Sequence, residues 1–174
     1  MRPITWRPLN IYGGPVANYS TVYWDSSVWI ALLWDEKVKG IDRAEVAQRV
    51  LEDAEKGLVT ILTSTFTLAE VFKLKIDPPA SLDPSQVIKS YFDHSFIKMI
   101  VLDRVVGEIA GDIARKHGIK PQDAVHLASA LCWEAEVVHT WDDQLVSKSG
   151  IIGTSPLKIE YPLWNWQAPM NLPG

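Results

Sequence analysis

The chain has 174 residues, of which 47% are hydrophobic and 22% are charged, and its formal net charge is −4. This composition is typical of a globular protein, and the length favours one domain with a core of its own. The net charge argues against a protein that holds nucleic acid by an overall positive field, but not against one that holds phosphates through bound cations.

Strands and helices alternate along the chain. Five strands are predicted at residues 22–24, 58–62, 96–102, 136–140 and 157–161. Helices are predicted at residues 26–35, 43–56, 65–74, from 84 onwards, 104–117, 121–133 and around 144–145. This alternation predicts a mostly parallel sheet with helices on both faces, the α/β class. We expect an irregular extension over 1–20, one domain over 21–162 and a tail with tryptophan and proline over 163–174.

Cysteine usage and hydropathy indicate the compartment. The single cysteine, Cys132, cannot form an intramolecular disulfide, and its apolar helical surroundings predict that it is buried. The amino terminus does not resemble a signal peptide, and no apolar run is long enough to span a membrane. We therefore expect a cytoplasmic protein with no membrane segment.

Acidic residues occur where strands end and helices begin. Asp25 follows the first strand, Glu70 lies in the helix after the second, and Asp123 opens the helix that starts at Pro121. Asp142 and Asp143 follow the fourth strand. Each acid alone is explained by helix capping or turn formation. Because parallel strands end at one edge of a sheet, the set together predicts a single acidic site.

Converging carboxylates repel one another unless a cation neutralises them. Ligand sets made only of oxygen atoms favour Mg²⁺ or Mn²⁺, ions that assist phosphodiester hydrolysis. The sequence contains no nucleophile elbow, Walker loop, dinucleotide loop or zinc pattern. His126, three residues after Asp123, is interpreted as a packing or supporting residue, because no nucleophile is spaced to use it.

Four motifs occur in an order and spacing that resemble those of the PIN-domain nucleases, and among them the VapC-type toxins. The motifs are Tyr23-Trp24-Asp25-Ser26-Ser27, Ser64-x-x-Thr67-Leu68-Ala69-Glu70-Val71, Pro121-Gln122-Asp123-Ala124 with the helix that follows, and Thr140-Trp141-Asp142. The resemblance implies a three-layer α/β/α sandwich with a five-stranded sheet of order 3-2-1-4-5. It also implies a Mg²⁺- or Mn²⁺-dependent endoribonuclease.

The same resemblance assigns roles to individual residues. The catalytic, metal-binding acids would be Asp25, Glu70, Asp123 and Asp142. Ser26 and Thr140 would orient the site, and Asp143 would be an additional acid. The resemblance further implies an RNA substrate, a homodimer and an antitoxin that blocks the acidic pocket with a peptide.

Two alternatives stay open from the sequence. A non-catalytic PIN-like module that binds RNA or protein would keep the fold without metal competence. A phosphotransfer protein would also place acids at strand ends. However, its phosphatase form normally carries a second acid two residues after the first, where this chain has Ser27.

Overall fold

The computed structural model describes residues 19–72 and 84–162. The predicted extension over 1–20, apart from Tyr19 and Ser20, and the predicted tail over 163–174 lie outside these ranges. Within the described ranges, none of the helices has the length and apolar character needed to cross a lipid bilayer.

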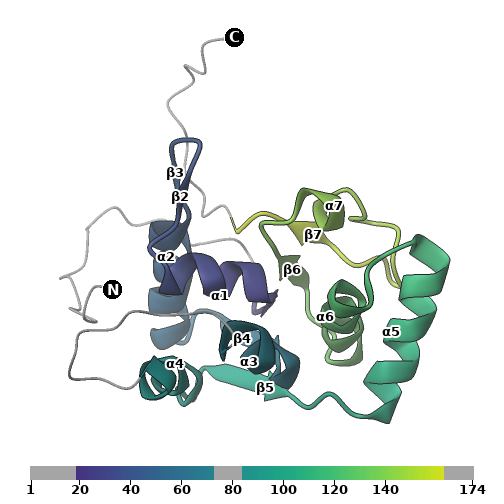
Figure 1. The fold of residues 1–174 in the computed structure, drawn as a ribbon, viewed down its shortest axis with the longest axis horizontal. Helices are drawn as coiled ribbons and strands as arrows, with labels where there is room; N and C mark the ends of the chain where they lie inside the picture. The colour runs from purple at the N-terminus through teal and green to yellow at the C-terminus, as the bar shows by residue number, and fades with distance from the viewer. Residues whose placement is uncertain (1–18, 73–83, 163–174) are drawn as a thin grey trace, which may run out of the picture.

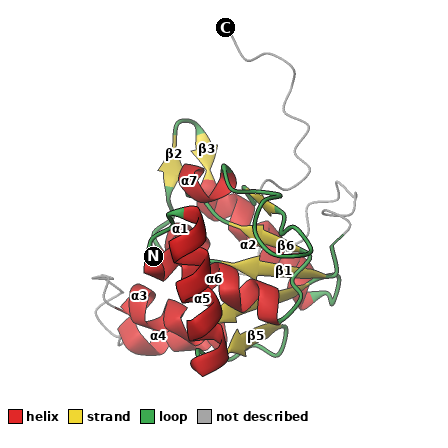
Figure 2. Cartoon of the chain, turned by 90° about the vertical axis from the view of Figure 1, so that its right-hand side faces the viewer, coloured by secondary structure: helices red, strands yellow, loops and turns green. Residues whose placement is uncertain are grey.

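A five-stranded parallel sheet forms the centre of the molecule. Its strands are β1 (Thr21–Trp24), β4 (Thr60–Ser64), β5 (Ile97–Ile100), β6 (Val137–His139) and β7 (Ile159–Glu160). Their order is β5-β4-β1-β6-β7, and all neighbouring strands are parallel. This confirms the predicted order 3-2-1-4-5 and places β1 in the middle. Figure 2 shows β6, β1 and β5 in this sequence from top to bottom. In the register, Tyr23 pairs with Leu62 of β4 and with Val138 of β6.

Helices cover both faces of the sheet. One group consists of α1 (Ser26–Leu33), α2 (Arg43–Glu55), α3 (Thr65–Phe72) and α4 (Pro84–Phe92). The other consists of α5 (Arg104–His117), α6 (Pro121–Cys132) and the short α7 (Asp143–Val146). Figure 1 shows α1, α2 and α4 to the left of α5 and α6. The predicted three-layer sandwich is therefore confirmed.

The side chains of β1 divide the interior into two cores. Trp24 belongs to the cluster beneath the first group of helices, whereas Tyr23 belongs to the cluster beneath the second. This division follows from the two-residue period of a strand, which sends neighbouring side chains to opposite faces. Both residues are completely buried. The site described below begins one residue later, at Asp25.

Local sequence determines where several helices begin and end. The Asp42 carboxylate accepts from the amide of Glu45 and caps α2, as the sequence predicts. The Asp103 carboxylate caps α5 in the same way, by accepting from the amide of Val106. Gly118 ends α5 with φ +64°, a left-handed conformation that favours glycine. Pro121 occupies the first position of α6, where its missing N–H costs nothing.

Two features differ from the sequence prediction. A small antiparallel hairpin, β2 (Lys37–Val38) with β3 (Ile41–Asp42), projects at the top of Figures 1 and 2 and was not predicted. Its strands are too short to show an alternating pattern, although Gly40 at its turn has φ +81°. The prediction that Cys132 is buried is wrong. Cys132 is the last residue of α6, and the two residues that follow it are also exposed.

Candidate functional site

Asp25 lies at the carboxyl end of the central strand and caps α1. Its main-chain N–H donates to the carbonyl of His139, which ties it to the end of β6. Its carboxylate accepts from the amides of Ser27, at 2.9 Å, and Val28, at 3.3 Å. Only 4% of Asp25 is exposed, and this burial raises the pKa of its carboxyl group. Asp25 therefore caps α1, and its burial makes the ionised form of its carboxyl group less favourable.

Two hydroxyl groups support the Asp25 carboxylate. The Ser27 hydroxyl donates to Asp25 Oδ1 at 2.6 Å and lies 3.4 Å from the Thr140 hydroxyl. Hydrogen bonds from Ser27 and Thr140 both act to lower the pKa of Asp25, against the effect of burial. Thr140 therefore lies beside Ser27 and Asp25, and the orienting role that the resemblance gives it stays a prediction. The serine that makes these contacts is Ser27. Ser26, for which the sequence predicted an orienting role, is half-buried in the first turn of α1.

A chain of hydrogen bonds runs from the buried Tyr23 hydroxyl to the partly buried Glu70 carboxylate. The Tyr23 hydroxyl lies 2.8 Å from His126 Nδ1, and His126 Nε2 lies 2.8 Å from a carboxylate oxygen of Glu70. His126 is only 2% exposed, and its positive form acts to lower the pKa of both Asp25 and Asp123. The imidazole thus hydrogen-bonds to Glu70 on α3 and lies near enough to the two aspartates to affect their pKa values. The interpretation of His126 as a packing or supporting residue stays a prediction.

Asp123 and Asp142 complete the acidic edge. Asp123 is half-buried in the first turn of α6, and Asp142 caps α7 by accepting from the amide of Gln144 at 2.7 Å. The pKa of Asp123 is raised first by burial and then by the Asp142 carboxylate, with a smaller contribution from Asp25. The carboxylates of Asp142 and Asp25 therefore both repel that of Asp123 at one edge of the sheet.

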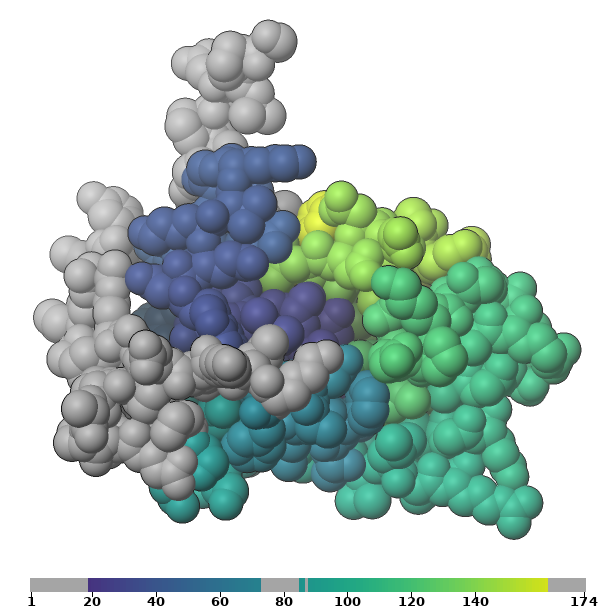
Figure 3. All heavy atoms as spheres, viewed as in Figure 1, coloured from purple at the N-terminus to yellow at the C-terminus, as the bar shows by residue number. Residues whose placement is uncertain are grey.

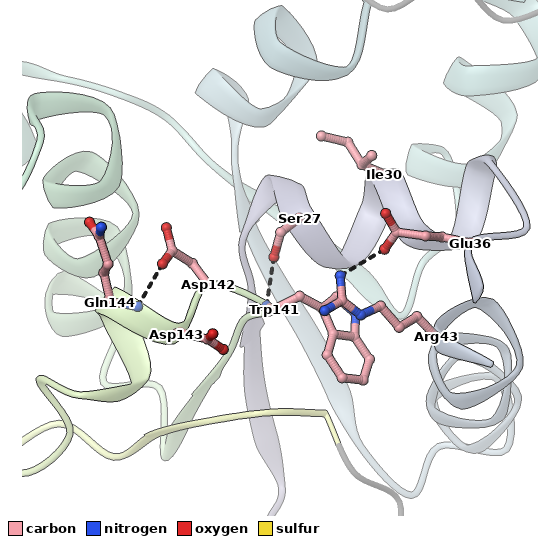
Figure 4. A pocket seen from close by; sticks show the side chains of 8 residues that line it. All are labelled: Ser27, Ile30, Glu36, Arg43, Trp141, Asp142, Asp143 and Gln144. Atoms are coloured by element: carbon pink, nitrogen blue, oxygen red, sulfur yellow. Dashed lines mark hydrogen bonds and ion pairs between the residues drawn. The ribbon is translucent and has the colours of Figure 1, made fainter. Parts of the chain in front are cut away.

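Asp143 is engaged differently from the other acids. Its side chain is exposed and accepts a hydrogen bond of 2.6 Å from the Tyr161 hydroxyl. This bond raises the pKa of Tyr161. Asp143 lines a hollow beside the acidic edge that is shared with Ser27 and Asp142 (Figure 4).

The acids fit a hard divalent cation by their chemistry. Their donor atoms are carboxylate oxygens, which Mg²⁺ and Mn²⁺ prefer, and the repulsion around Asp123 is what a cation would relieve. Among residues 19–72 and 84–162, however, no three acidic, histidine or cysteine side chains are grouped as ligands of one ion. The carboxylates therefore lie along the same edge of the sheet, but they do not surround a single point.

Replacing Ser27 with alanine should lower the free energy of unfolding by about 1–3 kcal/mol, because Asp25 loses a donor and the Trp141 amide loses its acceptor at 2.8 Å. The same change should raise the pKa of Asp25 further. Urea denaturation and carboxyl ¹³C NMR titration measure the two effects. Ser26→Ala, one residue away in the same turn, is the control. Equal losses in the two variants would show that the Ser27 contacts carry no special weight.

Sequence reasoning missed several residues around the site. Ser27 could have been found, because an aspartate at a helix start often hydrogen-bonds to groups two residues later. Tyr23 could not, because its place in a buried strand gives no sign that its hydroxyl contacts a histidine 103 positions later. Arg43 also carried no signal in the sequence, although it lines the hollow beside Asp142.

Comparison with known proteins identifies the family of this chain. A family model described as PIN domain matches residues 22–150, which covers the sheet from β1 to β6 and every acid of the edge. No sequence of a curated protein matches the chain.

Several solved structures share the fold at 17% sequence identity. A toxin–antitoxin complex from Klebsiella pneumoniae aligns over 82% of this chain and 98% of its own, with a TM-score of 0.56. VapC20 from Mycobacterium tuberculosis, described as a sarcin-ricin loop cleaving toxin, aligns over 78% and 99%, with a TM-score of 0.55. VapBC2 from Rickettsia felis, bound to a DNA fragment from its promoter, aligns over 83% and 99%, with a TM-score of 0.53.

Proposed function

Because the chain belongs to the PIN domain family, we propose that it is a metal-dependent endoribonuclease and the toxin of a VapC-type toxin–antitoxin pair. The observation that carries this proposal is that Asp25 and Asp142 follow the neighbouring strands β1 and β6 and that the carboxylates of both raise the pKa of Asp123. Acids whose pKa is raised by burial and by another carboxylate are found more often at functional sites than elsewhere.

In this proposal the residues have distinct roles. Asp25, Glu70, Asp123 and Asp142 hold Mg²⁺ or Mn²⁺. When bound, the cation supplies an activated water and stabilises negative charge on the leaving oxygen of the phosphodiester. Around these acids, Ser27 and Thr140 orient the Asp25 carboxylate through their hydroxyl groups.

His126 is a positioning residue in the same scheme. It holds the Glu70 carboxylate through Nε2, while the Tyr23 hydroxyl fixes the other ring nitrogen. Because the imidazole is only 2% exposed, it cannot turn away without leaving polar groups unpaired. The position of the Glu70 carboxylate is therefore fixed relative to α6, and the scheme requires no protein nucleophile or covalent intermediate.

The similar structures support the choice of substrate and partners. One of them is described as a toxin that cleaves the sarcin-ricin loop, and another is a toxin–antitoxin complex. We extend these properties to this chain as a proposal: an RNA substrate and an antitoxin protein that covers the acidic edge. The homodimer that the sequence resemblance implies is part of the same proposal. A non-catalytic PIN-like module is the alternative, and it differs by binding no metal at this edge.

Adding Mn²⁺ should stabilise the folded protein, because the cation binds the native acidic edge and offsets its repulsion. At a metal concentration of about 100 times Kd the gain is about 2.7 kcal/mol, and thermal unfolding with and without EDTA measures it. The gain should shrink at lower pH, since protons compete for carboxyl groups whose pKa is raised.

The same samples should cleave a structured RNA in Mn²⁺ and not in EDTA. Asp112→Asn, which changes an exposed acid on α5, is the control and should behave as the wild type in both assays. A protein that is neither stabilised by Mn²⁺ nor able to cleave RNA would instead be the non-catalytic module.

A further inference from the structure

A hollow of about 490 Å³ opens beside the acidic edge. It is lined by Ser27, Ile30, Glu36, Arg43, Trp141, Asp142, Asp143 and Gln144. In the space-filling view, the blue surface from the α1–α2 region adjoins the yellow-green surface that follows β6 (Figure 3). Figure 4 shows Arg43 and Glu36 on one side, Asp142 and Gln144 on the other, and Trp141 between them. Its volume lies within the range of small-ligand sites, and it shares Asp142 with the acidic edge.

A stack of planar groups forms one wall of the hollow. The guanidinium carbon of Arg43 lies 4.7 Å from the centroid of the Trp141 ring. On Trp141, the ring of Tyr161 stacks at 6.0 Å with an interplanar angle of 25°. Arg43 also forms an ion pair of 2.9 Å with Glu36. These contacts hold a flat polar group beside the acids, backed by aromatic rings.

Two donors in this wall have no hydrogen-bond partner within the described residues. They are Arg43 Nε and the indole Nε1 of Trp141, and both atoms are buried. Trp141 as a whole is only 7% exposed. A buried donor without a partner is costly, and native proteins keep few of them. The side chains that carry these two donors both line the hollow, so a planar polar group that enters it lies against them.

The charge of the lining determines which group fits. Glu36 neutralises the charge of Arg43, and Asp142 and Asp143 add negative charge nearby. A phosphate would therefore be repelled. An uncharged, planar ring with donors and acceptors at its edge fits better, because it can stack on the guanidinium and use polar side chains such as Gln144.

On the premise of the proposed ribonuclease function, we propose that the hollow binds an unpaired nucleobase of the RNA, next to the phosphodiester held at the acidic edge. Bases turned out of single-stranded RNA stack on aromatic rings and on arginine guanidinium planes. In this arrangement Arg43 positions the base and determines which base is accepted. The ring of Trp141 holds the Arg43 guanidinium in place.

Nucleoside binding tests the hollow without relying on catalysis. The four ribonucleosides are added separately to ¹⁵N-labelled protein in EDTA, and the indole N–H signal of Trp141 is followed by NMR. Its assignment comes from Trp141→Phe. At least one nucleoside should shift this signal, whereas ribose, which lacks a base, should not. Equal shifts by ribose, or none by any nucleoside, would overturn the proposal.

Two variants connect the hollow to cleavage. Arg43→Lys keeps the charge but removes the planar group, so KM for a single-stranded RNA should rise by about tenfold with little change in kcat. Arg49→Lys changes another arginine of α2, which pairs with Glu45 away from the hollow, and should leave both constants unchanged. An unchanged KM for Arg43→Lys would refute the role of Arg43. Absence of cleavage by the wild type would instead refute the nuclease function, and the NMR result would still decide whether the hollow binds a base.

Discussion

Replacing Asp123 with asparagine should abolish RNA cleavage while the fold survives. Asparagine has the same shape but removes the negative charge that would bind the cation, so we expect kcat/KM to fall by about 10³-fold or more. Asp123 is half-buried in the first turn of α6, and its main contribution to that helix is its charge near the amino terminus, worth about 0.3–1 kcal/mol. Cleavage of a defined RNA in Mn²⁺ measures the activity, and circular dichroism measures the fold.

The same substitution should change how stability depends on pH. In the folded protein the pKa of Asp123 is raised above its ordinary value of 3.8. An acid of this kind stabilises the fold while protonated, and that stability is lost as the pH rises through its folded-state pKa. In EDTA, wild-type stability should therefore fall more steeply from acidic to neutral pH than that of Asp123→Asn. This loss of stability at neutral pH is the cost of keeping charged acids together for metal binding.

Asp25→Asn serves as an independent second variant. Asparagine caps helices as well as aspartate does, so α1 should keep its start. Its cleavage activity should fall as far as that of Asp123→Asn, since both acids belong to one site. Undiminished Mn²⁺-dependent cleavage by either purified variant would refute the assignment of that acid.

Much of the architecture was predictable because local signals and topology agree. The alternation of apolar strands with capped helices leaves few ways to build the sheet, and the order of its strands followed the resemblance. Asp25 follows β1 and Asp142 follows β6. Because these two strands are parallel neighbours in the sheet, their carboxyl ends bring the two acids close together. The position of Asp25 and Asp142 at this edge of the sheet could therefore be predicted from the sequence.

The finer organisation was not predictable, because it depends on contacts between distant residues. Nothing local indicates that Trp141 carries Arg43 on its ring or that Tyr23 contacts His126. The sequence also could not show how tightly the carboxylates converge, since that depends on side-chain positions set by both cores. A sequence can thus identify which acids share an edge, but not which neighbours hold them.

Replacing Trp29 with alanine should have the largest effect on stability, lowering the free energy of unfolding by about 3–5 kcal/mol. Trp29 is fully buried on α1, and its ring lies 4.9 Å from that of Trp24 and 4.6 Å from that of Phe92. Its indole N–H also donates to the Thr63 hydroxyl at 3.2 Å. The smaller side chain leaves a cavity between α1, β1 and α4 that these large rings cannot fill.

Such a loss is a large share of the roughly 5–15 kcal/mol that stabilises a typical domain. It should also reach the site, because α1 begins at Asp25 and is held against the sheet by Trp29. Urea denaturation gives the loss, and cleavage assays under conditions in which the variant is folded give the effect on the site. Trp133→Ala is the control, since Trp133 is 52% exposed, and it should change stability by no more than about 0.5 kcal/mol. If both tryptophan variants lost the same stability, the packing of α1 on the sheet would not be what fixes the position of Asp25.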